Sequence, residues 1–198
     1  MTALGAVASS QEQPVFTVVV VVGTDHHRFD RLVEWLDDWA ERQTAPTRVV
    51  VQHGSARGPR VGEGHALLPH SDLQALMLEA SVLVVHGGPA TICEAWRHGH
   101  LPVVVPRDPR LGEHVDAHQQ RFGRRLGGQG LVLLCEQREQ LETALDQARC
   151  DPSHVLFGLE GREELVGRTV ARFGEVVDAL LEGRPARRGV LARLLRRR

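Results

Sequence analysis

The segment VFTVVVVVG, residues 15–23, is an almost unbroken run of β-branched residues that ends at a glycine. Such a run is typical of a strand buried on both faces, as in a parallel sheet. Residues 29–39 follow, with apolar side chains every three or four positions, which is the spacing of one helix face. A buried strand followed at once by an amphipathic helix is the first half of a strand–helix–strand unit.

The same alternation continues along the chain. We expect the N-cap of the second helix at Ser71. Strands that alternate with helices of this length predict an α/β fold with a doubly wound, Rossmann-like parallel sheet. The predicted strands are 48–51, 66–68, 82–85, 102–105 and 131–134, and the predicted helices are 72–80, 91–98, 113–126 and 138–148.

The chain of 198 residues has 42% hydrophobic and 25% charged residues, which is ordinary for a globular protein. Its net charge of −1 does not favour nucleic-acid binding, yet residues 184–198 carry seven Arg and no acid. We predict a flexible N-terminus over 1–14, a Rossmann-like domain over 15–150, a C-terminal helix over 151–183 and a basic tail over 184–198.

Missing residue types exclude several chemistries. The chain has no Lys and no Tyr, which rules out a P-loop lysine, a Schiff-base lysine and a Tyr/Lys proton relay. It has three Cys and no CxxC motif, so a disulfide framework or a structural zinc site is not expected. The first residues do not resemble a signal peptide, and no apolar run is long enough to cross a bilayer. These features favour the cytoplasm.

Ligands of open parallel sheets bind beyond the carboxyl ends of the strands. Four predicted strand ends carry polar or titratable residues, and three of the four also carry glycine. We therefore expect the chemistry of the protein to lie there. These four stretches are 23–27 (GTDHH), 52–55 (QHGS), 86–91 (HGGPAT), and 106–108 (PRD) with the following 113–119 (EHVDAHQ).

The third stretch is the most specific. Gly87 and Gly88 let the backbone approach a ligand closely, and Pro89 fits the first position of a helix. The free N–H groups of such a helix start suit a diphosphate. Thr91 adds a hydroxyl, and Glu94 lies one turn later, where its carboxylate can accept both hydroxyls of a ribose. The same residues also fit a plain Gly-Gly turn followed by a solvated glutamate.

The many histidines leave alternatives open. His114 and His118 stand four residues apart in a predicted helix, which is metal-ligand spacing, but the sequence shows no third ligand and we expect no metal. His26 and His27 are the candidates for a general base, although an exposed pair of loop histidines fits equally well. Residues 127–130 (GGQG) precede a strand, so we interpret them as a helix C-cap rather than a dinucleotide motif.

Several of these motifs occur together in the order of a known family. The chain resembles the C-terminal, donor-binding domain of family-28 glycosyltransferases, which are MurG-like enzymes of GT-B type, over about residues 15–145. It is most similar to the free-standing catalytic subunits of split UDP-sugar transferases. The motifs are His86-Gly87-Gly88, the Thr91-to-Glu94 helix start, the strand from Pro102 to Pro106, Asp116-Ala117-His118-Gln119, and the opening Val-Gly-Thr with 29–33.

The resemblance assigns roles to individual residues. It implies that Glu94 binds the ribose of UDP, that residues 88–91 hold the diphosphate together with Thr24, and that His118 and Gln119 contact the donor sugar. His86 and the loop Asp25-His26-His27 depart from the family pattern. The predicted nucleotide-sugar site comprises Gly23, Thr24, His53, Gly54, His86, Gly87, Gly88, Pro89, Ala90, Thr91, Glu94, Arg107, His118 and Gln119.

The resemblance also implies a function. We expect the donor-binding catalytic subunit of a split, inverting glycosyltransferase that moves a hexosyl or N-acetylhexosaminyl group from a UDP-sugar to a lipid-linked saccharide. No cofactor is expected, and a membrane-anchored acceptor-binding subunit is the expected partner. The protein would lie at the inner face of the cell membrane, with residues 184–198 against anionic lipid. The alternatives are a non-catalytic nucleotide-sugar-binding subunit and a UDP-sugar hydrolase.

Overall fold

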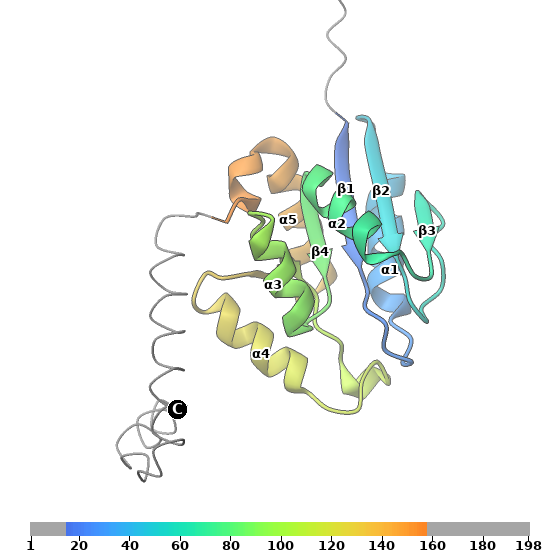
Figure 1. Ribbon diagram of the computed structural model, residues 1–198, viewed down its shortest axis with the longest axis vertical. Coiled ribbons are helices and arrows are strands. Elements are labelled where there is room, and N and C mark those ends of the chain that lie inside the picture. Colours follow the sequence, from blue (N-terminus) through green and yellow to red (C-terminus); the bar gives the residue numbers. More distant parts are fainter. Residues whose placement is uncertain (1–14, 158–198) are drawn as a thin grey trace, which may run out of the picture. The chain divides into compact units, whose positions relative to one another are not determined.

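The computed structural model describes residues 15–157, which form an α/β structure around one sheet (Figure 1). All six strands are parallel, and their order is β3-β2-β1-β4-β5-β6. This confirms the predicted Rossmann-like fold class. The strands are β1 (Phe16–Val21), β2 (Thr47–Gln52), β3 (Glu63–His65), β4 (Val82–Val85), β5 (Val103–Val104) and β6 (Leu133–Leu134).

Helices cover both faces of the sheet. One hydrophobic cluster joins one face to α1 and α5, and a second joins the other face to α2, α3 and α4. The α-helices are α1 (Asp30–Glu41), α2 (His70–Glu79), α3 (Pro89–Arg97), α4 (His118–Gly127) and α5 (Arg138–Cys150), and the short 3₁₀ helices are η1 (Pro109–Leu111) and η2 (Pro152–Val155).

The two covered faces explain the apolar run of β1. Successive side chains of a strand point to opposite faces, so Val18 and Val20 pack in the cluster of α1 and α5. Val19 and Val21 pack in the other cluster, and all four are at most 2% exposed. A strand covered on only one face would have alternated polar and apolar residues.

Three predicted boundaries are wrong. The third strand is β3, not residues 66–68, and it is a short polar edge strand. Helix α2 begins at His70, and its N-cap is Pro69 rather than Ser71, which lies inside the helix. Helix α4 begins at His118 instead of residue 113, because residues 113–117 form a loop.

His100 is 6% exposed, and its Nε2 donates to the Met77 carbonyl at 2.8 Å. Cys93 is exposed. Helix α4 does end at Gly127 with Gly128 as its C-cap, as predicted from the glycine-rich stretch.

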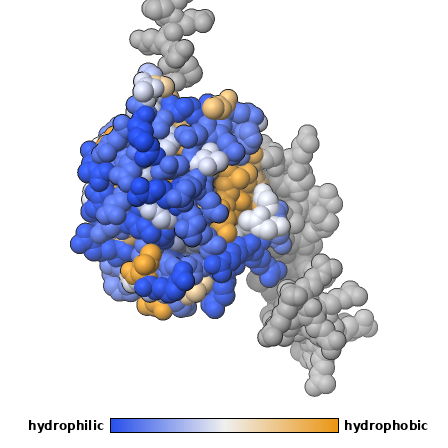
Figure 2. Space-filling view, turned by 180° about the vertical axis from the view of Figure 1, so that it is seen from behind, coloured by the Kyte–Doolittle hydropathy of each residue, from blue (hydrophilic) through white to orange (hydrophobic). Residues whose placement is uncertain are grey.

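The surface of the described residues is mostly hydrophilic, with a few apolar patches (Figure 2). Within residues 15–157, no helix is long and apolar enough to span a membrane. The predicted N-terminus over 1–14, most of the segment 151–183 and the basic tail over 184–198 lie outside the described residues.

Candidate functional site

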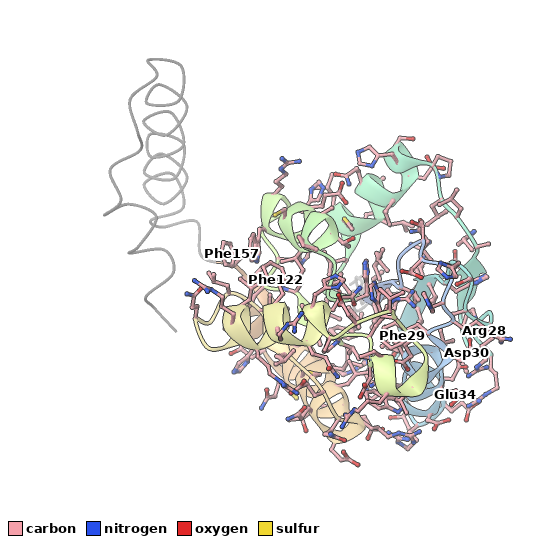
Figure 3. All side chains as sticks on the ribbon, turned by 90° about the horizontal axis from the view of Figure 1, so that it is seen from below. Arg28, Phe29, Asp30, Glu34, Phe122 and Phe157 are labelled. Carbon is pink, nitrogen blue, oxygen red and sulfur yellow. The ribbon has the colours of Figure 1, made fainter. Side chains whose placement is uncertain are left out.

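The strand order places a topological switch point between β1 and β4. The chain runs from β1 outward to β2 and β3, and then returns to the other side of β1 with β4, β5 and β6. At such a switch point the loops after two adjacent strands turn to opposite faces and leave room for a ligand. Here the loops after β1 and β4 flank that point. Figure 3 views the molecule from below Figure 1, toward the carboxyl ends of β1 and β4.

The turn after β4 is shaped by the ring of His86. Its Nδ1 lies 3.3 Å from the Val21 carbonyl oxygen, which accepts its hydrogen bond. The ring lies over Gly23 and Gly88, since a Cβ built on Gly23 would come within 2.8 Å of His86 Cε1, and one on Gly88 would overlap the ring. Both glycines are therefore required by this packing. Burial lowers the pKa of His86 to about 4, so the imidazole is neutral near pH 7.

Helix α3 starts with unpaired donors. Its N-cap is Gly88, which has no side chain to cap the helix, and Pro89 occupies the first turn. The first hydrogen bond of the helix is from the Ile92 N–H to the Gly88 carbonyl. The N–H groups of Ala90 and Thr91 consequently remain available, with the positive end of the helix dipole behind them. This arrangement can bind an anion such as a diphosphate.

Glu94 follows one turn after these donors. Its side chain is 24% exposed, and the nearest basic atom among the described residues is Nδ1 of the exposed His70, at 4.0 Å from Oε1. The carboxylate therefore forms no close ion pair with another described residue. A carboxylate in this state can accept hydrogen bonds from a diol.

The loop after β1 is organised by Asp25, while Thr24 is exposed. Asp25 Oδ1 accepts from the His27 backbone N–H at 2.8 Å and from His27 Nδ1 at 2.6 Å. Its Oδ2 lies 3.4 Å from His114 Nε2. Although burial raises it, the pKa of Asp25 falls to about 2, because the hydrogen bonds from His27 and the nearby Arg107 charge stabilise the carboxylate. His26 is 85% exposed at its side chain.

Arg107 holds this loop to its neighbours. It is fully buried, and its two terminal nitrogens donate to the carbonyls of His27, Val22 and Glu113 at 2.6 to 3.0 Å. Burial lowers its pKa, while Asp25 and Glu113 favour the charged form. The guanidinium therefore faces backbone carbonyls and is fully buried, instead of lying at the surface where a ligand could reach it.

The loop before α4 brings two predicted residues to different places. His118 is exposed, and its Nδ1 lies 2.6 Å from Asp116 Oδ1. Gln119 is buried against Gly87, and its Oε1 accepts from the Arg107 backbone N–H at 3.3 Å. His118 is thus free to contact a ligand, whereas Gln119 packs the turn after β4 against α4.

The loop after β2 supports the loop after β1. The Nδ1–H of His53 donates to the Ala56 carbonyl at 2.9 Å. Gly54 has a φ of +57°, and a Cβ there would overlap the Gly23 carbonyl oxygen. The close approach of these two turns accounts for the glycine at position 54.

Sequence reasoning missed the buried ion pair of Arg31 and Glu113. Arg31 Nε and Nη2 donate to the two Glu113 oxygens, both at 2.8 Å, and the Asp108 N–H donates to the same carboxylate. Arg31 lies in the first turn of α1, the helix that begins at Asp30, which is labelled in Figure 3. The pair fixes the loop between β5 and α4. Its members are 82 residues apart, so no local motif indicates it.

The comparisons agree with this geometry. Residues 17–156 match the model of the glycosyltransferase family 28 C-terminal domain. The chain belongs to this family. No curated protein sequence matches the chain significantly.

Solved structures share the fold of this family-28 domain. A glycosyltransferase of kitacinnamycin and MurG of Acinetobacter baumannii each superpose with a TM-score of 0.53 at 20% identity, over 76% and 73% of this chain. The calicheamicin glycosyltransferase CalG4 superposes over 73% of it with a TM-score of 0.50 at 20% identity. The chain covers 40%, 44% and 38% of these three proteins, respectively, so it corresponds to less than half of each.

Proposed function

We propose that the chain is the donor-binding catalytic subunit of a split glycosyltransferase. Its donor would be a UDP-sugar, and its acceptor a lipid-linked saccharide used in polysaccharide or cell-envelope synthesis. The observation that carries the proposal is the uncapped start of α3 followed one turn later by Glu94. The backbone N–H groups could bind a diphosphate, and the Glu94 carboxylate could bind a ribose. Their sequence along the helix matches the sequence of these two groups in a nucleoside diphosphate.

The same geometry supports a mechanism of transfer with inversion. An acceptor hydroxyl would attack the anomeric carbon as the bond to the UDP oxygen breaks, and negative charge would develop on the departing diphosphate. The N–H groups of Ala90 and Thr91 would stabilise that charge from a fixed position. Because these donors come from the backbone, this role requires no metal ion.

Of the two histidines considered as a general base, His27 fits better than His26. The Asp25 carboxylate accepts from Nδ1–H of His27 at 2.6 Å, which fixes the tautomer and leaves Nε2 free to take a proton. His26 is 3.4 Å from the same carboxylate and mostly exposed. The base that acts on the acceptor could equally be supplied by the partner.

The acceptor site is proposed to lie on a separate, membrane-anchored subunit. Support comes from the described residues, which form one α/β unit that matches the C-terminal, donor-type domain of family 28. The seven Arg of residues 184–198 would bring the protein to the inner, anionic face of the cell membrane. We expect the purified chain alone to bind UDP and to transfer sugar poorly to a lipid-linked acceptor.

Calorimetric titration of UDP into the Glu94→Gln variant tests the donor site. Losing charge-assisted hydrogen bonds to a ribose costs about 1.5 to 3 kcal/mol, so the dissociation constant should rise by roughly ten- to a hundredfold. Glu139→Gln, an exposed change at the start of α5, is the matched control and should leave UDP affinity unchanged. Unchanged affinity in folded Glu94→Gln would contradict the assignment.

A turnover assay separates the proposed transferase from its alternatives. The proposal expects sugar transfer only when the partner and acceptor are present. Release of free sugar from a UDP-sugar without an acceptor would indicate a hydrolase. Donor binding with no turnover in the presence of the partner would indicate a non-catalytic subunit.

A further inference from the structure

Titratable side chains from two segments far apart in sequence meet beyond the carboxyl ends of the strands. Asp25 and His27 come from the loop after β1, His114 comes from the loop that leads into α4, and His118 is the first residue of α4. The His27 and His114 rings stack with centroids 5.9 Å apart, and the His114 and His118 rings meet edge to face at 4.7 Å. Asp25 Oδ2 joins the two loops by its 3.4 Å approach to His114 Nε2.

Asp116 is the residue that changes the interpretation of this cluster. If residues 113–126 were helical, His114 and His118 would share a face and Asp116 would point elsewhere. The loop over 113–117 instead places one ligand atom from each of His114, Asp116 and His118 within 4.8 Å of one another. The backbone N–H of His118 donates to Asp116 Oδ1 at 2.8 Å, which holds that carboxylate beside the ring.

We propose that His114, Asp116 and His118 bind one divalent transition-metal ion, with Asp25 as the nearest further ligand. This departs from the expectation of no metal. Two imidazole nitrogens with carboxylate oxygen are a ligand set suited to Zn²⁺ and its neighbours, and less suited to Mg²⁺ or Ca²⁺. His114 is only 11% exposed at its side chain, so one ligand is held firmly while Asp116 and His118 are open to solvent.

The ion would link the loop before α4 to the loop after β1. It would add a crosslink next to those that Arg107 and the Arg31–Glu113 pair already make. This role is distinct from diphosphate binding at the start of α3, so the proposal does not depend on the donor assignment. It does predict that His118 is less free to meet a ligand when the metal is bound.

The test uses the full chain stripped with EDTA and dialysed, then titrated with Zn²⁺ against a chromophoric chelator. We expect one tight site per chain, and a Co²⁺ absorption spectrum typical of nitrogen and oxygen ligands. His118→Ala and Asp116→Asn should each weaken this site by about tenfold or more. His154→Ala is the matched control because His154 also faces an aspartate, with its Nδ1 3.5 Å from Asp151 Oδ2, and it should leave the affinity unchanged.

Equal affinities in the control and in folded His118→Ala would overturn the proposal, because the eleven histidines of the chain would then be binding zinc without a defined site. Far-ultraviolet circular dichroism checks that each variant is folded. Zn²⁺ should also raise the melting temperature of the unmodified chain but not that of Asp116→Asn. An unchanged melting temperature at saturating Zn²⁺ would likewise contradict the proposed link between the two loops.

Discussion

Replacing Arg107 by Met is the sharpest test of how the site loops are held. Arg107 is 0% exposed, and its terminal nitrogens donate to three backbone carbonyls, those of Val22, His27 and Glu113. Methionine fills the space of the aliphatic part of the arginine side chain, but it is shorter and has no group that could donate to these carbonyls. The substitution therefore removes the hydrogen bonds and the packing of the guanidinium, while it keeps the packing of the aliphatic part.

The cost follows from those three bonds. A hydrogen bond to a charged group contributes about 1.5 to 3 kcal/mol, and a buried carbonyl left unpaired is itself unfavourable. Three such bonds give a gross loss of about 4.5 to 9 kcal/mol, from which the avoided burial of a charge is subtracted. We expect the free energy of unfolding to fall by about 3 kcal/mol. Arg107→Lys retains the charge but not the planar guanidinium. Its free energy of unfolding should lie between those of Arg107→Met and the unmodified protein.

Urea unfolding at pH 7 measures this change directly. Arg125→Met, an exposed change on α4, is the matched control and should alter the free energy of unfolding by less than about 0.5 kcal/mol. A loss below about 1 kcal/mol in Arg107→Met would refute the reasoning. It would mean that the three carbonyls find other donors or water without cost.

Three further predictions concern pH, metal and turnover. The folded-state pKa of His86 is lowered from 6.5 to about 4, so the unfolded chain binds a proton that the folded chain does not. The free energy of unfolding should therefore decrease as the pH falls through this range, by up to about 3 kcal/mol. In His86→Gln, the difference between the free energies of unfolding at pH 7 and pH 4.5, measured with urea, should be smaller. UDP affinity should be the same within about twofold in EDTA and in Mg²⁺, since helix α3 supplies backbone donors; a large loss in EDTA would place a metal at the diphosphate. Radiolabelled transfer to a lipid-linked acceptor should require the partner, and efficient transfer by the purified chain would contradict the split-enzyme proposal.

The buried strands and the helix start after β4 could be predicted because their signals are local. Val18 to Val21 need cover on both faces, whichever helices supply it, and the Gly88-Pro89 helix start with Glu94 lies within one strand end and one helix turn. The edge strand β3 could not be predicted in the same way. It is short and polar, and it pairs with β2 through its backbone and through Glu63, whose carboxylate accepts from Arg48 at 2.9 Å.

The contacts that hold the site together were not predictable, because their partners are far apart in sequence. Arg107 was expected to contact the ligand, because an arginine that follows a strand can bind a phosphate as well as a backbone carbonyl. Only the fold shows that it meets the carbonyls of Val22 and His27 instead. The third member of the histidine cluster was hidden for a related reason, because the pattern over 113–117 is compatible with a helix and the loop places Asp116 between His114 and His118.

The polar groups of this edge therefore divide into two kinds. Arg107, Glu113 and Gln119 are buried and hydrogen-bond to the loops that they connect, so they set positions. The start of α3 and the Glu94 carboxylate lie at the surface without close internal partners among the described residues. Groups that could hydrogen-bond internally but are held apart by a rigid framework are the ones available to a ligand. That division is why a change at Arg107 should act mainly on stability and a change at Glu94 mainly on UDP affinity.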